Sequence, residues 1–136
     1  MKLTQHFSLA EFTRSATAAQ KGIDNVPSAT AIGNMRHLCE RVLEPLRDHV
    51  GHPITITSGY RSQRLNKAVG GVDNSQHMSG EAADLAISSL RQGREWMEWI
   101  MDNCEFDQLI LEKAGSAIWL HVSCKRNRNE VFSTVK

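Results

Sequence analysis

Apolar residues recur at steps of three and four along one long segment that begins after Ser28. The members of this set are Ile32, Met35, Leu38, Cys39, Val42, Leu43 and Leu46. This spacing places apolar side chains on one face of a helix, so it predicts an amphipathic helix that ends at Gly51 and Pro53. Pro45 should kink or restart this helix, because proline has no amide hydrogen and clashes with the carbonyl four residues back.

Other segments are predicted to form shorter or separately capped helices. Ser8 and Glu11 form a capping-box pattern flanked by Phe7 and Phe12, which predicts a short helix, and a second short turn should follow from Thr17. We expect these early pieces to form a lid or platform and not part of the core. Two later helices are predicted, at 65–68 and at 89–103, and Trp96 and Trp99 in the last one have the spacing of core residues.

Alternating or β-branched stretches predict strands at 53–57, 82–87, 106–112 and 117–123. The last two strands should be joined by a turn around 113–116. Helices come first in the chain, and strands joined partly by hairpins follow them. This order predicts an α+β fold with a small, mainly antiparallel sheet backed by helices on one face. We expect 1–136 to form a single domain.

Strand parity divides the predicted sheet into a core face and an open face, because successive side chains of a strand point in opposite directions. Leu85, Leu109 and Leu120 belong to the apolar, core-facing set of their strands. The open face then receives the residues of opposite parity, namely Asp84, Ala86, Gln108, Ile110, Glu112, Trp119, His121 and Ser123. Parity therefore brings polar residues from three strands to one face.

Three of the polar residues form a candidate metal site. His77 lies in the loop before the second predicted strand, and we expect it to lie close to Asp84 and His121. Small residues keep the segment between His77 and Asp84 narrow. Zinc accepts imidazole nitrogen and carboxylate oxygen at roughly 2.0–2.2 Å, and three protein ligands leave a position for water. Taken singly, each residue has an ordinary alternative, such as a hydrogen-bonded histidine or a turn aspartate. Their combination favours zinc, and we regard the remaining histidines as structural.

Composition and charge narrow the function classes. With 136 residues, 40% of them hydrophobic, and a net charge of +1, the chain resembles an ordinary globular protein and indicates neither a nucleic-acid partner nor membrane insertion. The cysteines, Cys39, Cys104 and Cys124, form no C-x-x-C pair and should be reduced. The beginning of the chain lacks an apolar signal segment, so we expect a product that is made in the cytoplasm and stays there unless something else releases it. We expect a monomer.

The end of the chain is basic. It carries Lys125, Arg126, Arg128 and Lys136 against Glu130 alone. We expect a solvated tail, and the alternative is that these charges favour an anionic surface.

The motif Ser75-x-His77-x-x-Gly80-x-Ala82-x-Asp84, followed by Trp119-x-His121, resembles the zinc signature of the M15 family of peptidoglycan peptidases. The likeness extends over most of the chain, through the segments 6–12, 58–62, 69–71 and 106–110. The family includes D-alanyl-D-alanine carboxypeptidases, D-Ala-D-Ala dipeptidases and phage L-alanyl-D-glutamate endolysins, and the chain is most similar to its compact single-domain branch.

The resemblance implies a zinc ion held by His77, Asp84 and His121, with an acid/base carboxylate beside it. It also implies that Arg61 contacts the substrate or the developing oxyanion. The expected reaction is hydrolysis of a peptide bond in a peptidoglycan stem peptide, with zinc-bound water as the nucleophile. The sequence leaves open whether the enzyme is an endopeptidase or a carboxypeptidase.

The family's acid/base position differs in this chain. Many members carry Asp or Glu three residues before the last histidine, where this chain has Ile118, and an aliphatic side chain cannot transfer a proton. We therefore assign the general base to Glu112, which shares the open face with the metal ligands. Glu81 is a weaker candidate, because its side chain should point away from the metal. Two further readings remain: a non-catalytic peptidoglycan-binding module, and a zinc-stabilised structural domain.

Overall fold

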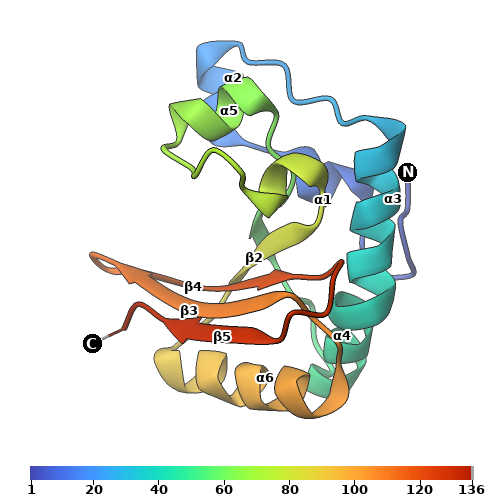
Figure 1. The fold of residues 1–136 in the computed structure, drawn as a ribbon, viewed down its shortest axis with the longest axis vertical. Coiled ribbons are helices and arrows are strands. Elements are labelled where there is room, and N and C mark those ends of the chain that lie inside the picture. The colour runs from blue at the N-terminus through green and yellow to red at the C-terminus, as the bar shows by residue number, and fades with distance from the viewer. Residues whose placement is uncertain (136) are drawn as a thin grey trace.

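The computed structural model describes residues 1–135 and has an α+β fold (Figure 1). The helical elements are α1 (Leu9–Thr13), α2 (Ala16–Lys21), α3 (Ala29–Leu38), the π-helix η1 (Cys39–Leu43), α4 (Glu44–Val50), α5 (Gln63–Ala68), the 3-10 helix η2 (Gln76–Ser79) and α6 (Leu90–Asn103). The strands are β1 (Ile56–Ser58), β2 (Ala82–Ala86), β3 (Gln108–Ala114), β4 (Ala117–Ser123) and β5 (Glu130–Ser133). The predicted fold class is confirmed.

The strands form one five-stranded sheet in the order β1-β2-β4-β3-β5. All neighbours are antiparallel except β3 and β5, which are parallel, so the sheet is mainly antiparallel as expected. β5 was not predicted, because Val131 and Phe132 are both exposed and the segment lacks the alternation of a half-buried strand. The expected solvated tail is therefore partly an edge strand. Lys136, which belongs to the same basic segment, lies outside the described residues.

The core lies between one face of the sheet and the helices that cover it. α6 runs along this face against β3 and β4, and α4 packs against α6 (Figure 1). The sheet contributes the fully buried side chains of Leu85, Leu109 and Leu120, as parity predicted, and α6 contributes Trp96 and Ile100. The apolar side chains of each strand thus face the helices, and the polar side chains of opposite parity lie on the other face of the sheet.

The long helix predicted from Ser28 is interrupted in the way its sequence requires. α3 passes into the π-helical turn η1, and α4 then begins with Pro45 in its first turn. In a π-helical turn each N–H bonds to the carbonyl five residues back, so the hydrogen-bond pattern shifts just before Pro45. The missing amide hydrogen of Pro45 therefore does not interrupt a regular α-helical series of hydrogen bonds. Gly51, at φ 75°, ends the helix in the left-handed conformation.

The N-terminal segments contribute to the core as well as to the open face. Leu3, Phe7 and Phe12 are buried in the main core, so the expectation that these pieces stay outside it is wrong. The capping box of Ser8 and Glu11 forms as predicted. Phe12 of α1 is fully buried, while residues 14–17, which follow the helix, line the cavity described below.

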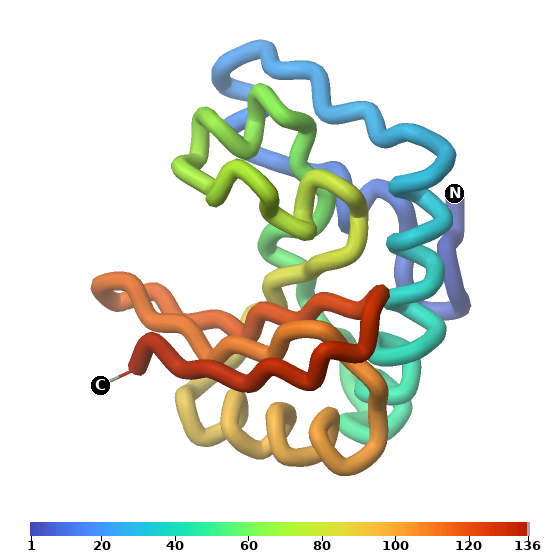
Figure 2. The backbone as a smooth tube through the Cα atoms, in the orientation of Figure 1, coloured from blue at the N-terminus to red at the C-terminus, as the bar shows by residue number. Residues whose placement is uncertain are grey.

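The chain between β1 and β2 rises away from the sheet and returns to it (Figure 2). This excursion contains α5 and η2, and α5 packs beside α2. The space between these helices and the open face of the sheet is the site described below. Cys39, Cys104 and Cys124 are free thiols, as expected. Within residues 1–135, no helix combines the length and the apolar character needed to cross a bilayer.

Candidate metal centre

Asp84 on β2 and His121 on β4 are directly paired across two antiparallel strands. Directly opposite residues of such a pair project from the same face of the sheet at close range. His121 Nδ1 consequently lies 2.9 Å from Asp84 Oδ1. Main-chain hydrogen bonds of the sheet therefore fix two of the predicted metal ligands relative to each other.

His77 approaches the same carboxylate from η2. Its Nε2 lies 3.3 Å from Asp84 Oδ1, and its ring meets that of His121 edge-on, with centroids 5.2 Å apart. Its Nδ1 lies 2.6 Å from the carbonyl oxygen of Gly59. A ligating histidine usually donates its second ring N–H to such an acceptor, which leaves the other nitrogen unprotonated for the metal.

The convergence of these three side chains fits a zinc ion. One ligand atom from each of His77, Asp84 and His121 lies within 4.8 Å of the others. Two nitrogens and one carboxylate oxygen are one of the donor sets found in catalytic zinc sites. Burial alone would raise the pKa of Asp84, but the hydrogen bond with His121 and the nearby imidazole of His77 outweigh burial and hold that pKa well below its usual range. Asp84 is therefore ionised, as a ligand must be.

Two glycines allow the backbone to approach closely enough to build this centre. A Cβ added to Gly59 would lie 2.7 Å from the backbone of Phe12, and one added to Gly80 would lie 2.3 Å from the carbonyl oxygen of Ala31. Gly80 also has φ +77°, a conformation that favours glycine. Gly59 lets its own carbonyl reach His77, and Gly80 lets η2 pack against α3.

The metal ligands line a cavity of about 820 Å³. The predicted catalytic residues Glu112 and Arg61 line the same cavity, as does Trp119. Glu112 is half-buried, and one of its oxygens accepts the indole N–H of Trp119 at 2.6 Å. The structure thus brings all five residues predicted for the site to one cavity.

Arg61 enters the cavity from the segment that follows β1. Burial lowers the pKa of its guanidinium, whereas the charges of Asp84 and Glu112 raise it, and an arginine remains charged in any case. Its Nε is buried without a hydrogen-bond partner among the described residues. Its backbone amide donates to the carbonyl of His77 at 3.0 Å, so the arginine and the η2 turn are coupled through the main chain.

Neither Ile118 nor Glu81, the weaker candidate for the general base, lines the cavity. Ile118 pairs with Lys113 and packs against the core, so its side chain does not reach the cavity. Glu81 is buried but contacts Ser79, Gln76 and Arg126. Its side chain therefore points away from the metal ligands, as expected.

The sequence did not predict most of the hydrogen bonds that hold His77 and the Arg61 segment in place. Ser75 accepts the backbone N–H of His77, but nothing in the sequence indicated the Gly59 carbonyl as the partner of the His77 ring. Asn25 accepts the N–H of Ser62 at 2.7 Å and donates to the carbonyl of Tyr60. It thereby braces the segment that carries Arg61.

Comparison with known proteins agrees with this geometry. The profile of the family described as peptidase M15 matches residues 5–123, which include every predicted site residue. The chain belongs to the peptidase M15 family. The match ends where β4 ends, so β5 and the loop before it are features of this M15 peptidase that lie outside the matched region.

A curated relative gives more detail. The zinc D-Ala-D-Ala carboxypeptidase of Streptomyces albus G is 39% identical over 85 residues, which cover 62% of this M15 peptidase and 32% of the relative. The aligned part therefore spans about a third of that protein. Zinc is the metal that the family and the donor set of His77, Asp84 and His121 indicate.

Proposed function

We propose that this M15 peptidase hydrolyses peptide bonds in peptidoglycan stem peptides, with a zinc ion held by His77, Asp84 and His121. The observation that carries the proposal is the single cavity that contains this donor set together with the Glu112 carboxylate and the Arg61 guanidinium. The name of the Streptomyces albus G relative, a zinc D-Ala-D-Ala carboxypeptidase, supports the substrate class.

Glu112 serves as the general base. When bound, zinc lowers the pKa of a water ligand and polarises a carbonyl group. The Glu112 carboxylate takes the proton of the attacking water and passes a proton to the leaving amine. The indole of Trp119 occupies one carboxylate oxygen, so the other oxygen carries the proton. No covalent bond between enzyme and substrate is needed.

Arg61 recognises negative charge in the substrate. A guanidinium can pair with a carboxylate through two parallel hydrogen bonds, or it can donate to an oxygen on which negative charge develops. Its place in the same cavity as His121, and the buried Nε without a partner among residues 1–135, suit either role. Recognition of a terminal carboxylate would make the enzyme a carboxypeptidase, and oxyanion stabilisation is compatible with an endopeptidase.

The name of the relative favours the carboxypeptidase, and the endopeptidase is the second candidate. A non-catalytic module is the less favoured reading, because the cavity contains a half-buried carboxylate, Glu112, that such a module would not require. Glu112 on β3, the strand next to Ile118, thus supplies the carboxylate that is missing at position 118.

Mass spectrometry of purified peptidoglycan, incubated with the protein and added zinc, tests the proposal. New fragments should appear with zinc and disappear after chelation, and their masses identify the cleaved bond. Loss of a terminal alanine indicates the carboxypeptidase, whereas cleavage within the stem indicates the endopeptidase. If walls of several chemotypes yield no fragment while the protein binds one equivalent of zinc, the proposed hydrolysis is wrong.

A further inference from the structure

The loop after β4 returns to the mouth of the catalytic cavity. Arg128, in this loop, lines the same cavity as His77, Asp84 and His121. It lies beyond the part of the chain that the family profile matches. Its place at the cavity is therefore a property of this chain that family membership does not supply.

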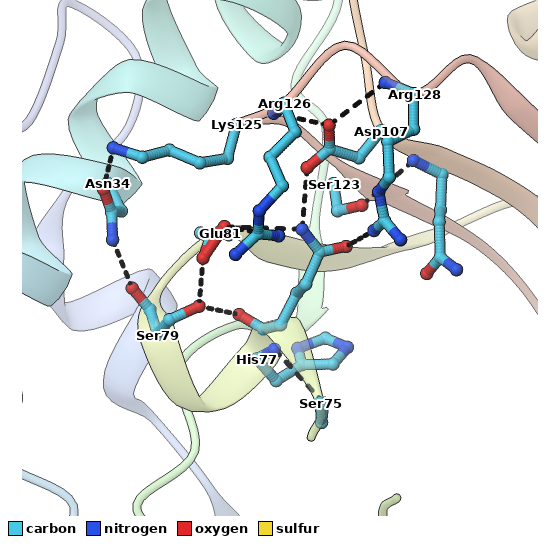
Figure 3. A network of polar contacts seen from close by, with 12 residues as sticks. Asn34, Ser75, His77, Ser79, Glu81, Asp107, Ser123, Lys125, Arg126 and Arg128 are labelled. Carbon is cyan, nitrogen blue, oxygen red and sulfur yellow. Dashed lines mark hydrogen bonds and ion pairs between the residues drawn. The ribbon is translucent and has the colours of Figure 1, made fainter.

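Buried Asp107 holds the backbone of this loop. Its Oδ1 accepts the N–H groups of Arg126 and Arg128 at 2.5 and 3.3 Å, and its own carbonyl accepts the N–H of Glu130 at 2.8 Å. Asn127 and Asn129 adopt positive φ angles of 56° and 55°, which asparagine tolerates better than most residues. The loop is consequently a shaped turn, and Figure 3 shows Arg128 beside Asp107 at its end.

The Arg128 guanidinium is oriented by a fixed partner. Its Nη2 donates to Gln76 Oε1 at 3.0 Å, and the amide of Gln76 in turn donates to Asp107 Oδ2 at 2.7 Å. Its Nη1 lies 3.5 Å from Glu130, and the side chain is 37% exposed. A guanidinium has five N–H donors, so these contacts leave donors for a ligand in the cavity.

The charges around the cavity favour an anionic ligand. Arg14, Arg61 and Arg128 line it, against the carboxylates of Asp84 and Glu112, and a bound zinc ion would add two further positive charges. Arginine clusters of this kind recognise carboxylates. A substrate with more than one carboxylate matches this lining better than a neutral peptide does.

Arg61 and Arg128 come from segments that adjoin the two opposite edge strands of the sheet. Arg61 follows β1 and Arg128 precedes β5, at the two edges of the sheet, while Asp84 and His121 lie on β2 and β4 between them. The open face continues from His121 to Ile110 and then to Phe132 by direct pairing. Phe132 is 49% exposed, so a peptide could extend over this face toward β5.

We propose that Arg128 determines substrate specificity by binding a free carboxylate of the stem peptide on the β5 side of the metal. This inference rests on the proposed function, because it concerns the same cavity. The carboxylate is a second one, distinct from the group that Arg61 meets. A charge-assisted hydrogen bond at a partly exposed site corresponds to a loss of about 10-fold in affinity when it is removed.

The test uses the stem pentapeptide Ala-γ-D-Glu-Lys-D-Ala-D-Ala in three forms. Both carboxylates are free in the first form, the D-glutamyl carboxylate is amidated in the second, and the C-terminal carboxylate is amidated in the third. Binding to the zinc-loaded protein is measured by calorimetry, together with KM and kcat wherever hydrolysis occurs. Arg128→Gln is compared with the unaltered chain and with Arg126→Gln, a matched control whose more exposed side chain does not line the cavity.

Arg128→Gln should weaken binding of the free peptide about 10-fold, with the effect in KM and not in kcat. One of the two amidated peptides should bind the unaltered chain equally weakly and lose nothing further in Arg128→Gln. Arg126→Gln should behave like the unaltered chain. An equal loss for all three peptides, or no loss for any, would overturn the proposal.

The contact with Gln76, next to His77, suggests a competing role in which Arg128 only positions the metal ligand. Zinc affinity, measured by chelator competition, separates the roles, since a carboxylate-binding residue leaves it unchanged. Weaker zinc binding in Arg128→Gln that accounts for the loss of peptide binding would reject carboxylate recognition. If no peptide is hydrolysed but the binding pattern holds, the proposed hydrolysis fails and carboxylate recognition by Arg128 stands.

Discussion

Trp119 donates its indole N–H to Oε2 of Glu112 at 2.6 Å, between residues that are directly paired across β3 and β4. Both side chains lie on the open face that carries the metal ligand His121. The sheet thus fixes the distance from the carboxylate to the metal site, and the indole fixes the direction of its free oxygen. A general base is effective only when it is held in reach of the proton that it takes.

Replacing the indole tests this orientation. Trp119→Phe keeps an aromatic ring but removes the N–H, so kcat should fall about 10-fold, as expected for the loss of one hydrogen bond to a charged group. Zinc affinity should stay unchanged. Trp99→Phe is the matched control, because Trp99 lies on α6 and stacks on His49, away from the cavity. An unchanged kcat in Trp119→Phe would show that the hydrogen bond does not orient the base.

Removing the base itself should have a larger effect. Glu112→Gln preserves shape and can still accept the indole N–H, but it cannot take a proton, so kcat should fall by about 10²–10⁴. Zinc should remain bound at full stoichiometry, as metal analysis would show. Glu95→Gln, in an exposed ion pair on α6, controls for removal of a carboxylate. Full activity of Glu112→Gln would refute the assignment.

Strand parity predicted much of the site, because it depends only on alternation within regular strands. It placed Asp84, Glu112 and His121 on one face, and the observed registers Asp84↔His121 and Glu112↔Trp119 agree. The boundaries were less accurate. β1 covers Ile56–Ser58 and β3 begins at Gln108, since hydrogen bonds to neighbouring strands, not local propensity, decide where a strand ends.

Strand parity could not predict the contacts that irregular segments make. The Gly59 carbonyl that holds His77, the Asn25 side chain that braces the Arg61 segment and the parallel pairing of β5 all join residues distant in sequence. Such contacts leave no periodic pattern along the chain. They depend on tertiary packing and therefore appear only in the structure.

Ile118 offers a test of the parity argument. It lies three residues before His121, where the resemblance led us to expect an acid/base carboxylate, but it packs against the core, so a carboxylate placed there cannot reach the cavity. The double variant Glu112→Gln with Ile118→Asp should stay as inactive as Glu112→Gln. Ile118→Asp alone should lower the free energy of unfolding by about 1–3 kcal/mol, because it places a charge in a partly buried apolar site. Recovery of activity in the double variant would contradict this placement.

Zinc removal should inactivate the protein without unfolding it. β2 and β4 are paired in the sheet and contribute to the core, and the His77 carbonyl of η2 accepts the N–H of Arg61, so contacts within the protein hold all three ligand segments. Zinc at 100 times its dissociation constant should add about 2.7 kcal/mol to the free energy of unfolding, measured as a rise in Tm. Asp84→Asn should show a much smaller rise at the same zinc concentration. A chain that is unfolded after chelation would instead favour the structural reading of the site.

Asp107 should make stability depend on acid pH. Burial raises its pKa, but hydrogen bonds from the side chain of Gln76 and the backbones of Arg126 and Arg128 outweigh burial and lower it. Since the pKa is lower in the folded state, the stabilisation is complete above the unfolded value of about 3.9. It is lost as the pH falls through the folded value.

Asp107→Asn should therefore lower the free energy of unfolding at pH 7 by about 1.5–3 kcal/mol, the contribution of hydrogen bonds to a charged group. The difference from the unaltered chain should shrink as the pH falls below about 4. Denaturant titrations at a series of pH values measure it, and Asp102→Asn on the exposed end of α6 is the control. A difference that stays constant down to pH 2 would mean that the Asp107 charge does not hold the loop that carries Arg128.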